Sequence, residues 1–212
     1  MKKALIISVT LFVVLSLVLI YFLSGIRNPE TYQTAEMMQS NTKEKPCCSS
    51  MDAEKLSDNS IYQLNSVWTT EKGNKIQLSD LKGKKQVMAM IFTNCTYACP
   101  LIVNDMKTIE SKVKRKDVEF LLISIDPVRD TPETLRKYAE NNKLDLNKWT
   151  LLTGAEKDIT ELAAVVGFKF KKERDGSYSH SNLINLLNEE GEIAYQHPGL
   201  NQDVQDVLNE LK

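Results

Sequence analysis

Residues 92–100, Phe92-Thr-Asn-Cys-Thr-Tyr-Ala-Cys-Pro100, join two segments of different character. Residues 87–92 form an apolar run, and residues 100–113 carry apolar side chains at helical spacing. This order of patterns predicts a β-strand, a loop and an α-helix. Pro100 suits the first helical turn, where a backbone N–H has no acceptor within the helix. The stretch therefore predicts the strand–loop–helix junction from which α/β folds are built.

Two cysteines, Cys95 and Cys99, lie in this loop. Because a residue before proline avoids the α region, we expect Cys99 at the mouth of the helix rather than inside it. There the positive end of the helix dipole would lower the pKa of its thiol and make it a metal ligand or a nucleophile. The alternative is a pair of small buried core residues, although the polar residues around the pair favour a loop.

The composition is that of a globular protein. A length of 212 residues predicts one domain with appendages. The net charge of −1 gives no electrostatic reason to expect nucleic acid as a partner. The four cysteines occur as two close pairs, too few and too clustered for a disulfide scaffold.

Residues 4–23 are apolar or small and follow Lys2 and Lys3. Such a run is long enough to span a bilayer as a helix, and it exceeds the apolar region of a cleaved signal peptide. We therefore expect residues 1–25 to be an uncleaved transmembrane anchor, with a signal peptide as the alternative. The positive-inside rule keeps the two lysines in the cytoplasm. The expected location is the cytoplasmic membrane of a bacterium, crossed once, with the domain facing the periplasm or extracytoplasmic space.

Residues 26–58 are polar and lack periodicity, which predicts a linker. The linker contains Met37-Met38 and Cys47-Cys48. These soft ligands could form an auxiliary Cu(I) site. A vicinal disulfide and incidental composition are the alternatives, and together they are favoured over a metal site.

Residues 59–212 carry the pattern of one folded domain. Strands are expected at 61–68, 75–78, 86–92, 118–125, 149–153, 182–187 and 192–195, and helices at 101–114, 132–142, 155–166 and 201–212. This order predicts an α/β domain with a central mixed sheet and helices on both faces. The cysteine loop then follows the C-terminal end of a strand, where sheets of this kind place their sites.

A second motif, Ser124-Ile-Asp-Pro-Val-Arg-Asp-Thr-Pro132, follows the next buried strand. Asp126, Arg129 and Asp130 are therefore expected at the same sheet edge as the cysteines. They either orient the metal-binding residues or dock a partner, or else they only cap turns and pair locally. The residues themselves leave both alternatives open.

The chain has two histidines. His180 ends the Gly- and Ser-containing stretch 174–180, which predicts a mobile loop that could swing the imidazole toward the cysteines. A single histidine is otherwise more often a structural or surface residue. His197 is expected in a turn, and we assign it no role.

Cys95-Thr-Tyr-Ala-Cys99-Pro100, the 124–132 motif and His180 together resemble the Sco/SenC family, and the resemblance extends over residues 61–212. It implies a thioredoxin-like fold with a membrane anchor, and it implies Cys95, Cys99 and His180 as copper ligands. It further implies a role in assembling the dinuclear copper centre of cytochrome c oxidase. The implied partners are the copper-site subunit of the oxidase and another copper carrier.

Four positions depart from the usual family pattern. Thr96 replaces a proline, Tyr97 and Ala98 stand where an acidic residue is common, and Ser179 replaces an aspartate before the histidine. None is an expected ligand, so copper binding should survive. Affinity, redox poise and partner preference could differ through residues around the ligands.

Two thiolates and one imidazole favour Cu(I) and also accommodate Cu(II). A structural zinc site normally has four protein ligands, whereas three are evident here. Three ligands leave an open position, which suits a protein that passes its metal on.

The competing function is that of a thiol–disulfide oxidoreductase without a stable metal, with Cys95 and Cys99 as its redox-active pair and extracytoplasmic thiols as its substrates. The pair has one more intervening residue than the usual C-x-x-C spacing, which weakens this interpretation. The two functions are compatible, because reducing a partner's cysteines would prepare them for copper. A peroxidase and a disulfide-bonded scaffold are weaker alternatives, and we expect a metallochaperone rather than an enzyme.

Overall fold

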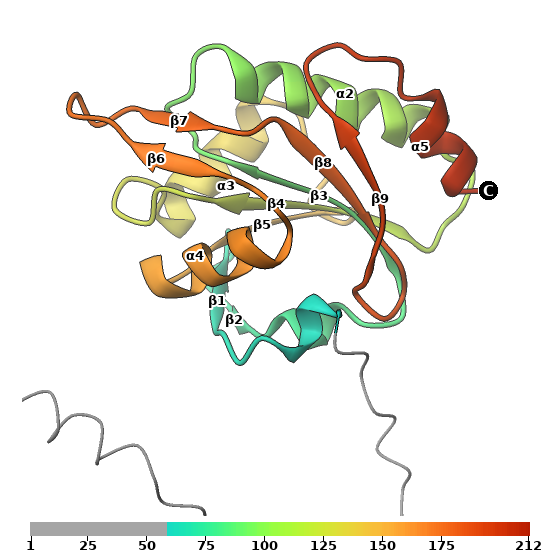
Figure 1. Ribbon diagram of the computed structural model, residues 1–212, viewed down its shortest axis with the longest axis horizontal. Helices are drawn as coiled ribbons and strands as arrows, with labels where there is room; N and C mark the ends of the chain where they lie inside the picture. The colour runs from blue at the N-terminus through green and yellow to red at the C-terminus, as the bar shows by residue number, and fades with distance from the viewer. Residues whose placement is uncertain (1–58) are drawn as a thin grey trace, which may run out of the picture. The chain divides into compact units, whose positions relative to one another are not determined.

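The computed structural model describes residues 59–212 (Figure 1). The expected anchor, residues 1–25, and linker, residues 26–58 with Cys47-Cys48, lie outside the described residues. Among the residues that are described, no helix has both the length and the apolar character needed to cross a membrane.

A seven-stranded mixed sheet forms the centre of the domain, in the order β2-β1-β5-β4-β3-β8-β9. The strands are β1 (Trp68–Thr70), β2 (Lys75–Ile76), β3 (Lys85–Ile91), β4 (Val118–Ser124), β5 (Trp149–Thr153), β8 (Leu183–Leu187) and β9 (Ile193–Pro198). The helices are α2 (Ala98–Lys112), α3 (Pro132–Asn141), α4 (Glu156–Val165) and α5 (Gln205–Glu210). Two further strands, β6 (Phe170–Lys172) and β7 (Tyr178–His180), form a separate antiparallel sheet.

The core is organised around β3 and β4, which run parallel from the pair Lys85 and Val118 to the pair Ile91 and Ser124. Residues 87–91 are all buried. A strand covered on both faces has no polar side, which explains its continuous apolar run. Helices α2, α3 and α5 lie on one side of the sheet and α4 lies on the other (Figure 1). The expected α/β architecture with helices on both faces is confirmed.

The prediction is accurate where burial or a cap gives a strong local signal. Strands β3, β4 and β5 and helix α4 agree with their expected ranges to within two residues. Helix α3 begins at Pro132, and the hydroxyl of Thr131 accepts a hydrogen bond from the N–H of Thr134. A capping hydroxyl before a proline is a strong signal for a helix start.

The two ends of the domain differ from the prediction. The expected strand 61–68 contains a 3₁₀ turn at Ile61–Gln63, because the Ser60 hydroxyl accepts from the N–H of Tyr62 and so caps a turn. At the other end, the final helix was expected to start at Asn201 and begins only at Gln205. The N–H of Asn201 instead donates to the buried Asp105 carboxylate, and its φ of 61° lies outside the range of an N-cap.

The expected loop at residues 174–180 is wrong for residues 178–180, which form strand β7, whereas residues 173–177 connect β6 to β7. Strands β6 and β7 pair antiparallel, with His180 opposite Phe170. His197 was expected in a turn and lies instead in β9, opposite Ile184 and buried. Strand β9 extends three residues beyond its expected end at 195.

Candidate metal centre

The cysteine loop connects the end of β3 to helix α2. The N–H of Cys95 donates to the carbonyl of Phe92, and this turn brings the half-buried Cys95 back toward the helix. Helix α2 begins at Ala98, two residues before Pro100. Proline is still tolerated there, because the N–H groups of the whole first turn lack intrahelical acceptors. Cys99 therefore lies inside the first turn and is fully buried, and its expected place just outside the helix is wrong.

The pKa values of the two thiols are shifted in opposite directions. Burial raises the pKa of the Cys99 thiol far above its ordinary value. Burial also acts on Cys95, but hydrogen bonds from the N–H of Cys99 and from the His180 side chain outweigh it and lower the pKa of Cys95 to about 7. The N–H of Cys99 points at the Cys95 sulfur from 3.3 Å. The sequence-based expectation of a lowered pKa at Cys99 is thus corrected, since the helix N-terminus stabilises the other thiolate.

His180 ends strand β7 and faces the cysteines. Its Nε2 lies 3.8 Å from Cys99 Sγ, and its Nδ1 lies 2.7 Å from the carbonyl oxygen of Ser181. A carbonyl oxygen only accepts, so Nδ1 carries a proton, and Nε2 is the nitrogen that faces the sulfurs. The imidazole packs edge-on against Phe92 and stacks on Phe168. These contacts orient Nε2 toward the sulfurs.

The ligand atoms of Cys95, Cys99 and His180 all lie within 4.8 Å of one another. Within residues 59–212, these three side chains form the cluster of potential ligands that could hold a metal ion. Two potential thiolates and one imidazole nitrogen are a soft donor set of the kind that suits Cu(I). The structure thus brings together the three residues that the sequence singled out. His197 is separate from this group, and its buried Nε2 has no hydrogen-bond partner among the described residues.

Asp130 joins the cysteine loop to strand β4. Its fully buried carboxylate accepts from the N–H of Thr93 at 3.0 Å, from the Thr93 hydroxyl at 2.5 Å and from the Ser124 hydroxyl at 2.5 Å. Burial raises the pKa of Asp130, although these donors act in the opposite direction. Asp130 therefore fixes the residue from which the cysteine loop starts.

Asp126 and Arg129 connect β4 to the β6–β7 hairpin. The Arg129 guanidinium pairs with the buried Asp126 carboxylate and donates to the carbonyl oxygen of Gly176 at 2.5 Å. The Tyr178 hydroxyl lies 3.5 Å from the other oxygen of Asp126. The ion pair of Arg129 with Asp126 and the turn that follows Asp126 agree with one of the two interpretations that the sequence left open. The contacts to the hairpin could not be read from the sequence.

Tyr138 on α3 is a neighbour of the site that sequence reasoning missed. Its hydroxyl is buried and has no hydrogen-bond partner among the described residues. Burial raises the pKa of Tyr138, and negative charge at Cys99, Cys95 and Asp130 raises it further, which places the phenol in the electrostatic range of the thiols. A single tyrosine in an amphipathic helix carries no sequence signal for such a position.

A family model described as SCO1/SenC matches residues 57–212. The chain belongs to the SCO1/SenC family. A Bacillus subtilis SCO1 protein homolog is 30% identical over 146 residues, which cover 66% of this chain and 76% of that relative. The Sco fold also agrees with solved structures. Arabidopsis thaliana ScoI with copper bound aligns with a TM-score of 0.61 and 25% identity over 68% of this chain and 91% of that one.

A second solved Sco structure is that of BsSco, described as a member of the Sco family of cytochrome c oxidase assembly proteins in which a disulfide switch was identified. It is 28% identical to this chain, with a TM-score of 0.61, and the alignment covers 68% of this chain and 88% of that one. The Sco relatives therefore confirm the α/β architecture that was expected from the sequence.

Proposed function

We propose that this protein is a metallochaperone that binds a copper ion through Cys95, Cys99 and His180. We further propose that it delivers the ion to the dinuclear copper centre of cytochrome c oxidase. The observation that carries the proposal is the convergence of two sulfurs and one imidazole nitrogen from separate elements within 4.8 Å. The copper-bound Arabidopsis relative and the assembly role named for BsSco support the choice of metal and recipient.

The chemistry of the three residues fits a transferable copper ion. Thiolate sulfur is a soft ligand that favours Cu(I), and the imidazole nitrogen helps to accommodate Cu(II). The Cys95 thiol, with a pKa of about 7, gives up its proton readily near neutral pH. Cys99 is buried and releases its proton only when a cation takes its place.

The difference in exposure between the cysteines suggests a route for transfer. Cys95 is half-buried, whereas Cys99 has no exposed surface. A recipient thiolate would therefore reach the copper ion from the side of Cys95 and displace that ligand first. Cys99 and His180 would hold the ion until the recipient's ligands have replaced them.

The proposed setting is the outer side of a bacterial cytoplasmic membrane. It follows from the apolar run at residues 4–23 and the preceding lysines. The proposed partners are the copper-site subunit of the oxidase and a second carrier that supplies the copper. Fractionation of cells that produce the full chain, combined with protease accessibility from each side of the membrane, tests this location.

A copper titration of the full chain in detergent tests the ligand assignment. Cys95→Ser, Cys99→Ser and His180→Ala should each lose the tight site that the unaltered protein has. His197→Ala is the matched histidine control and should retain it, provided that thermal unfolding shows an intact fold. Binding that survives all three ligand substitutions would refute the assignment. Loss only on replacing Cys47 and Cys48 would place the site in the linker.

A thiol–disulfide oxidoreductase is the second candidate, and the asymmetry of the two thiols favours it. A more accessible cysteine with a lowered pKa beside a buried one is the arrangement of an attacking and a resolving thiol. Turnover of a disulfide substrate by the copper-free protein measures this activity. A rate comparable to that of a dedicated reductase, unaffected by copper, would favour this function over copper delivery.

A further inference from the structure

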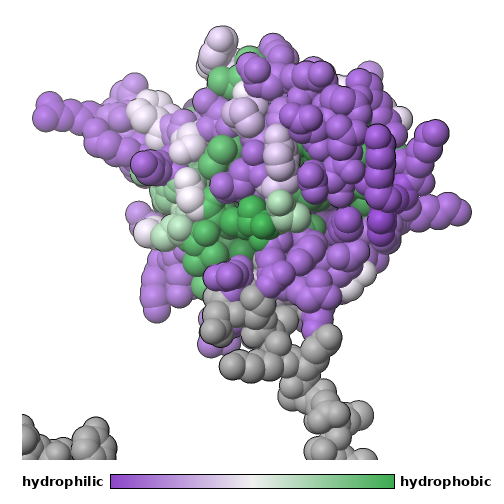
Figure 2. Space-filling view, turned by 45° about the vertical axis from the view of Figure 1, so that its right-hand side comes forward, coloured by the Kyte–Doolittle hydropathy of each residue, from purple (hydrophilic) through white to green (hydrophobic). Residues whose placement is uncertain are grey.

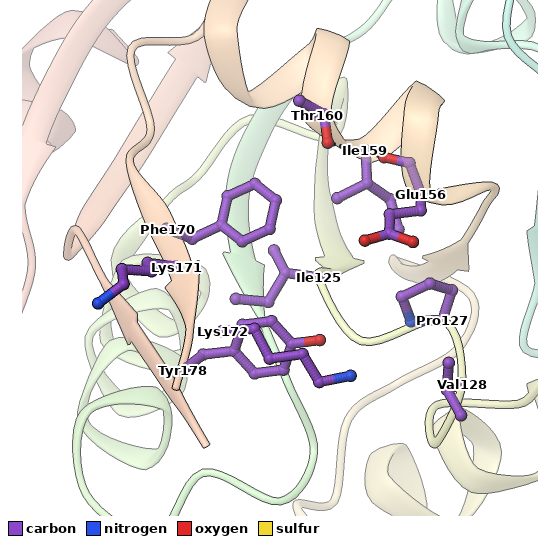
Figure 3. A pocket seen from close by; sticks show the side chains of 10 residues that line it. All are labelled: Ile125, Pro127, Val128, Glu156, Ile159, Thr160, Phe170, Lys171, Lys172 and Tyr178. Atoms are coloured by element: carbon purple, nitrogen blue, oxygen red, sulfur yellow. Dashed lines mark hydrogen bonds between the residues drawn. The ribbon is translucent and has the colours of Figure 1, made fainter. Parts of the chain in front are cut away.

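The His hairpin, residues 170–180, stands apart from the central sheet. Its two strands pair with each other and with no strand of the seven-stranded sheet. A cavity of about 270 Å³ lies between Phe170 and Tyr178 of the hairpin and Ile159 of helix α4 (Figure 3). In Figure 1 the hairpin projects beyond the sheet. The projecting part is hydrophilic, and a hydrophobic patch lies on the surface below it (Figure 2). The position of the hairpin is therefore set by side-chain contacts rather than by sheet pairing, and Phe170 and Tyr178 pack against the core.

The polar contacts of the outer half of the hairpin converge on one segment. In the part of the chain that the structure describes, the side-chain hydrogen bonds that join residues 173–178 to elements outside the hairpin run to Arg129 and Asp126. Arg129 donates a hydrogen bond to the carbonyl oxygen of Gly176 at the turn, and the Asp126 carboxylate accepts one from the Tyr178 hydroxyl. The Arg129 guanidinium also pairs with Asp126 itself. One planar side chain thus bridges the end of β4 and the tip of the hairpin.

The same segment holds the other half of the ligand set. Asp130, the residue after Arg129, fixes Thr93 at the start of the cysteine loop. Phe92 continues the link, because its ring contacts both Tyr178 and His180. Residues 126–130 therefore contact both the hairpin that carries the imidazole and the loop that carries Cys95.

We propose that Arg129 is a positioning residue for His180: its bridge from Asp126 to the Gly176 carbonyl holds the His hairpin over the cysteine pair. The inference rests on the proposed copper site and adds a residue that touches none of its three ligands. Loss of the bridge lets the hairpin move into the neighbouring cavity and takes Nε2 away from the sulfurs. Copper then keeps its two thiolates and loses the nitrogen for part of the time.

Arg129→Lys is the primary test, since lysine keeps a positive charge beside the buried Asp126. Its single ammonium lacks the fork that reaches both partners, so the bridge to Gly176 is lost or weakened. The matched control is Arg174→Lys, an exposed hairpin arginine with no ion pair or hydrogen bond to another of residues 59–212. A second variant, Asp126→Asn combined with Arg129→Met, removes both members of the ion pair and avoids leaving a buried charge alone.

The measurements use the full chain in detergent and copper as the probe. We expect the Arg129 variants to bind one copper ion with an affinity that is ten- to a hundredfold lower, the range found when residues that orient metal ligands are lost. The electron paramagnetic resonance spectrum of Cu(II) should shift toward that of His180→Ala. The melting temperature of the copper-free protein should remain close to that of the parent. Arg174→Lys should leave affinity and spectrum unchanged.

A double-variant comparison distinguishes positioning from a general structural role. If Arg129 acts through His180, adding Arg129→Lys to His180→Ala should cause no further loss of affinity. Additive losses, or a parental affinity and spectrum in the Arg129 variants, would overturn the proposal while leaving the copper site intact. If His180→Ala itself leaves copper binding unchanged, it is the proposed function that fails at that ligand.

Discussion

The backbone N–H of Cys99 donates a hydrogen bond to the sulfur of Cys95, 3.3 Å away. This N–H belongs to the first turn of helix α2, where backbone donors have no intrahelical acceptor. The helix N-terminus therefore stabilises negative charge on the cysteine that precedes it. The cysteine inside the turn is buried and is the weaker acid of the two.

The two thiols should differ in their reactivity with pH. The pKa of Cys95 is lowered from 9.0 to about 7, so its thiolate is present above pH 7 and disappears as pH falls through that value. The pKa of Cys99 is raised, so its thiolate stays scarce at the same pH. Alkylation of the reduced, copper-free protein, read by peptide mass, should therefore modify Cys95 first, with half-maximal rate near pH 7.

His180→Ala tests the cause of this difference, because the imidazole is one of the donors that lower the pKa of Cys95. The midpoint for Cys95 should move to higher pH in this variant, while His197→Ala should leave it in place. Equal rates at the two cysteines, or faster reaction of Cys99, would contradict the assignment of the acidic thiol.

Removal of the Asp130 carboxylate should destabilise the domain. Asp130→Ala leaves the N–H and hydroxyl of Thr93 and the hydroxyl of Ser124 without their acceptor in a buried site. An unsatisfied buried polar group costs about 1–3 kcal/mol of folding free energy. Urea unfolding of the copper-free protein should show a loss of at least that order.

Two further variants bracket this result. Asp130→Asn keeps one acceptor oxygen, and the hydroxyls can turn to meet its amide, so its loss should be smaller. Asp206→Ala removes an exposed carboxylate from α5 and should change the free energy of unfolding little. An Asp130→Ala protein as stable as the parent would show that Thr93 finds another acceptor.

The central elements could be predicted because their cause is local. Strands β3 and β4 are apolar throughout since both faces are covered, and α3 carries its own cap. The three residues of the metal centre were identified from the motifs and the resemblance that they support. Their convergence on one point was an expectation until the fold brought residues 95 and 180 together.

The remaining features depend on contacts between distant residues. Strands β6 and β7 are three residues long, and their exposed Lys171 and Ser179 produce no apolar run that could reveal a strand. The link from Asp130 to Thr93 spans 37 positions. Cys95 rather than Cys99 has the lowered pKa because the Cys99 N–H points at the Cys95 sulfur. The spacing of the two cysteines in the sequence does not determine the direction of that N–H.

The aromatic support of the imidazole gives the last prediction. Phe168 stacks on His180 with ring centroids 5.8 Å apart and an interplanar angle of 20°. A pair of this kind contributes about 0.5–1.5 kcal/mol beyond its buried area. Phe168→Leu keeps an apolar side chain but loses the flat surface that orients Nε2. Copper affinity, measured by competition with a chelator, should therefore fall about two- to twelvefold.

A second aromatic pair serves as the control for this prediction. Phe120 stacks on Trp149 in the core, with ring centroids 4.7 Å apart. Within the described domain, its ring pairs with none of the three candidate ligands. Phe120→Leu should destabilise the fold at least as much as Phe168→Leu, yet leave copper affinity near that of the parent. If both variants lose affinity equally, copper binding follows global stability, and stacking on His180 has no specific role.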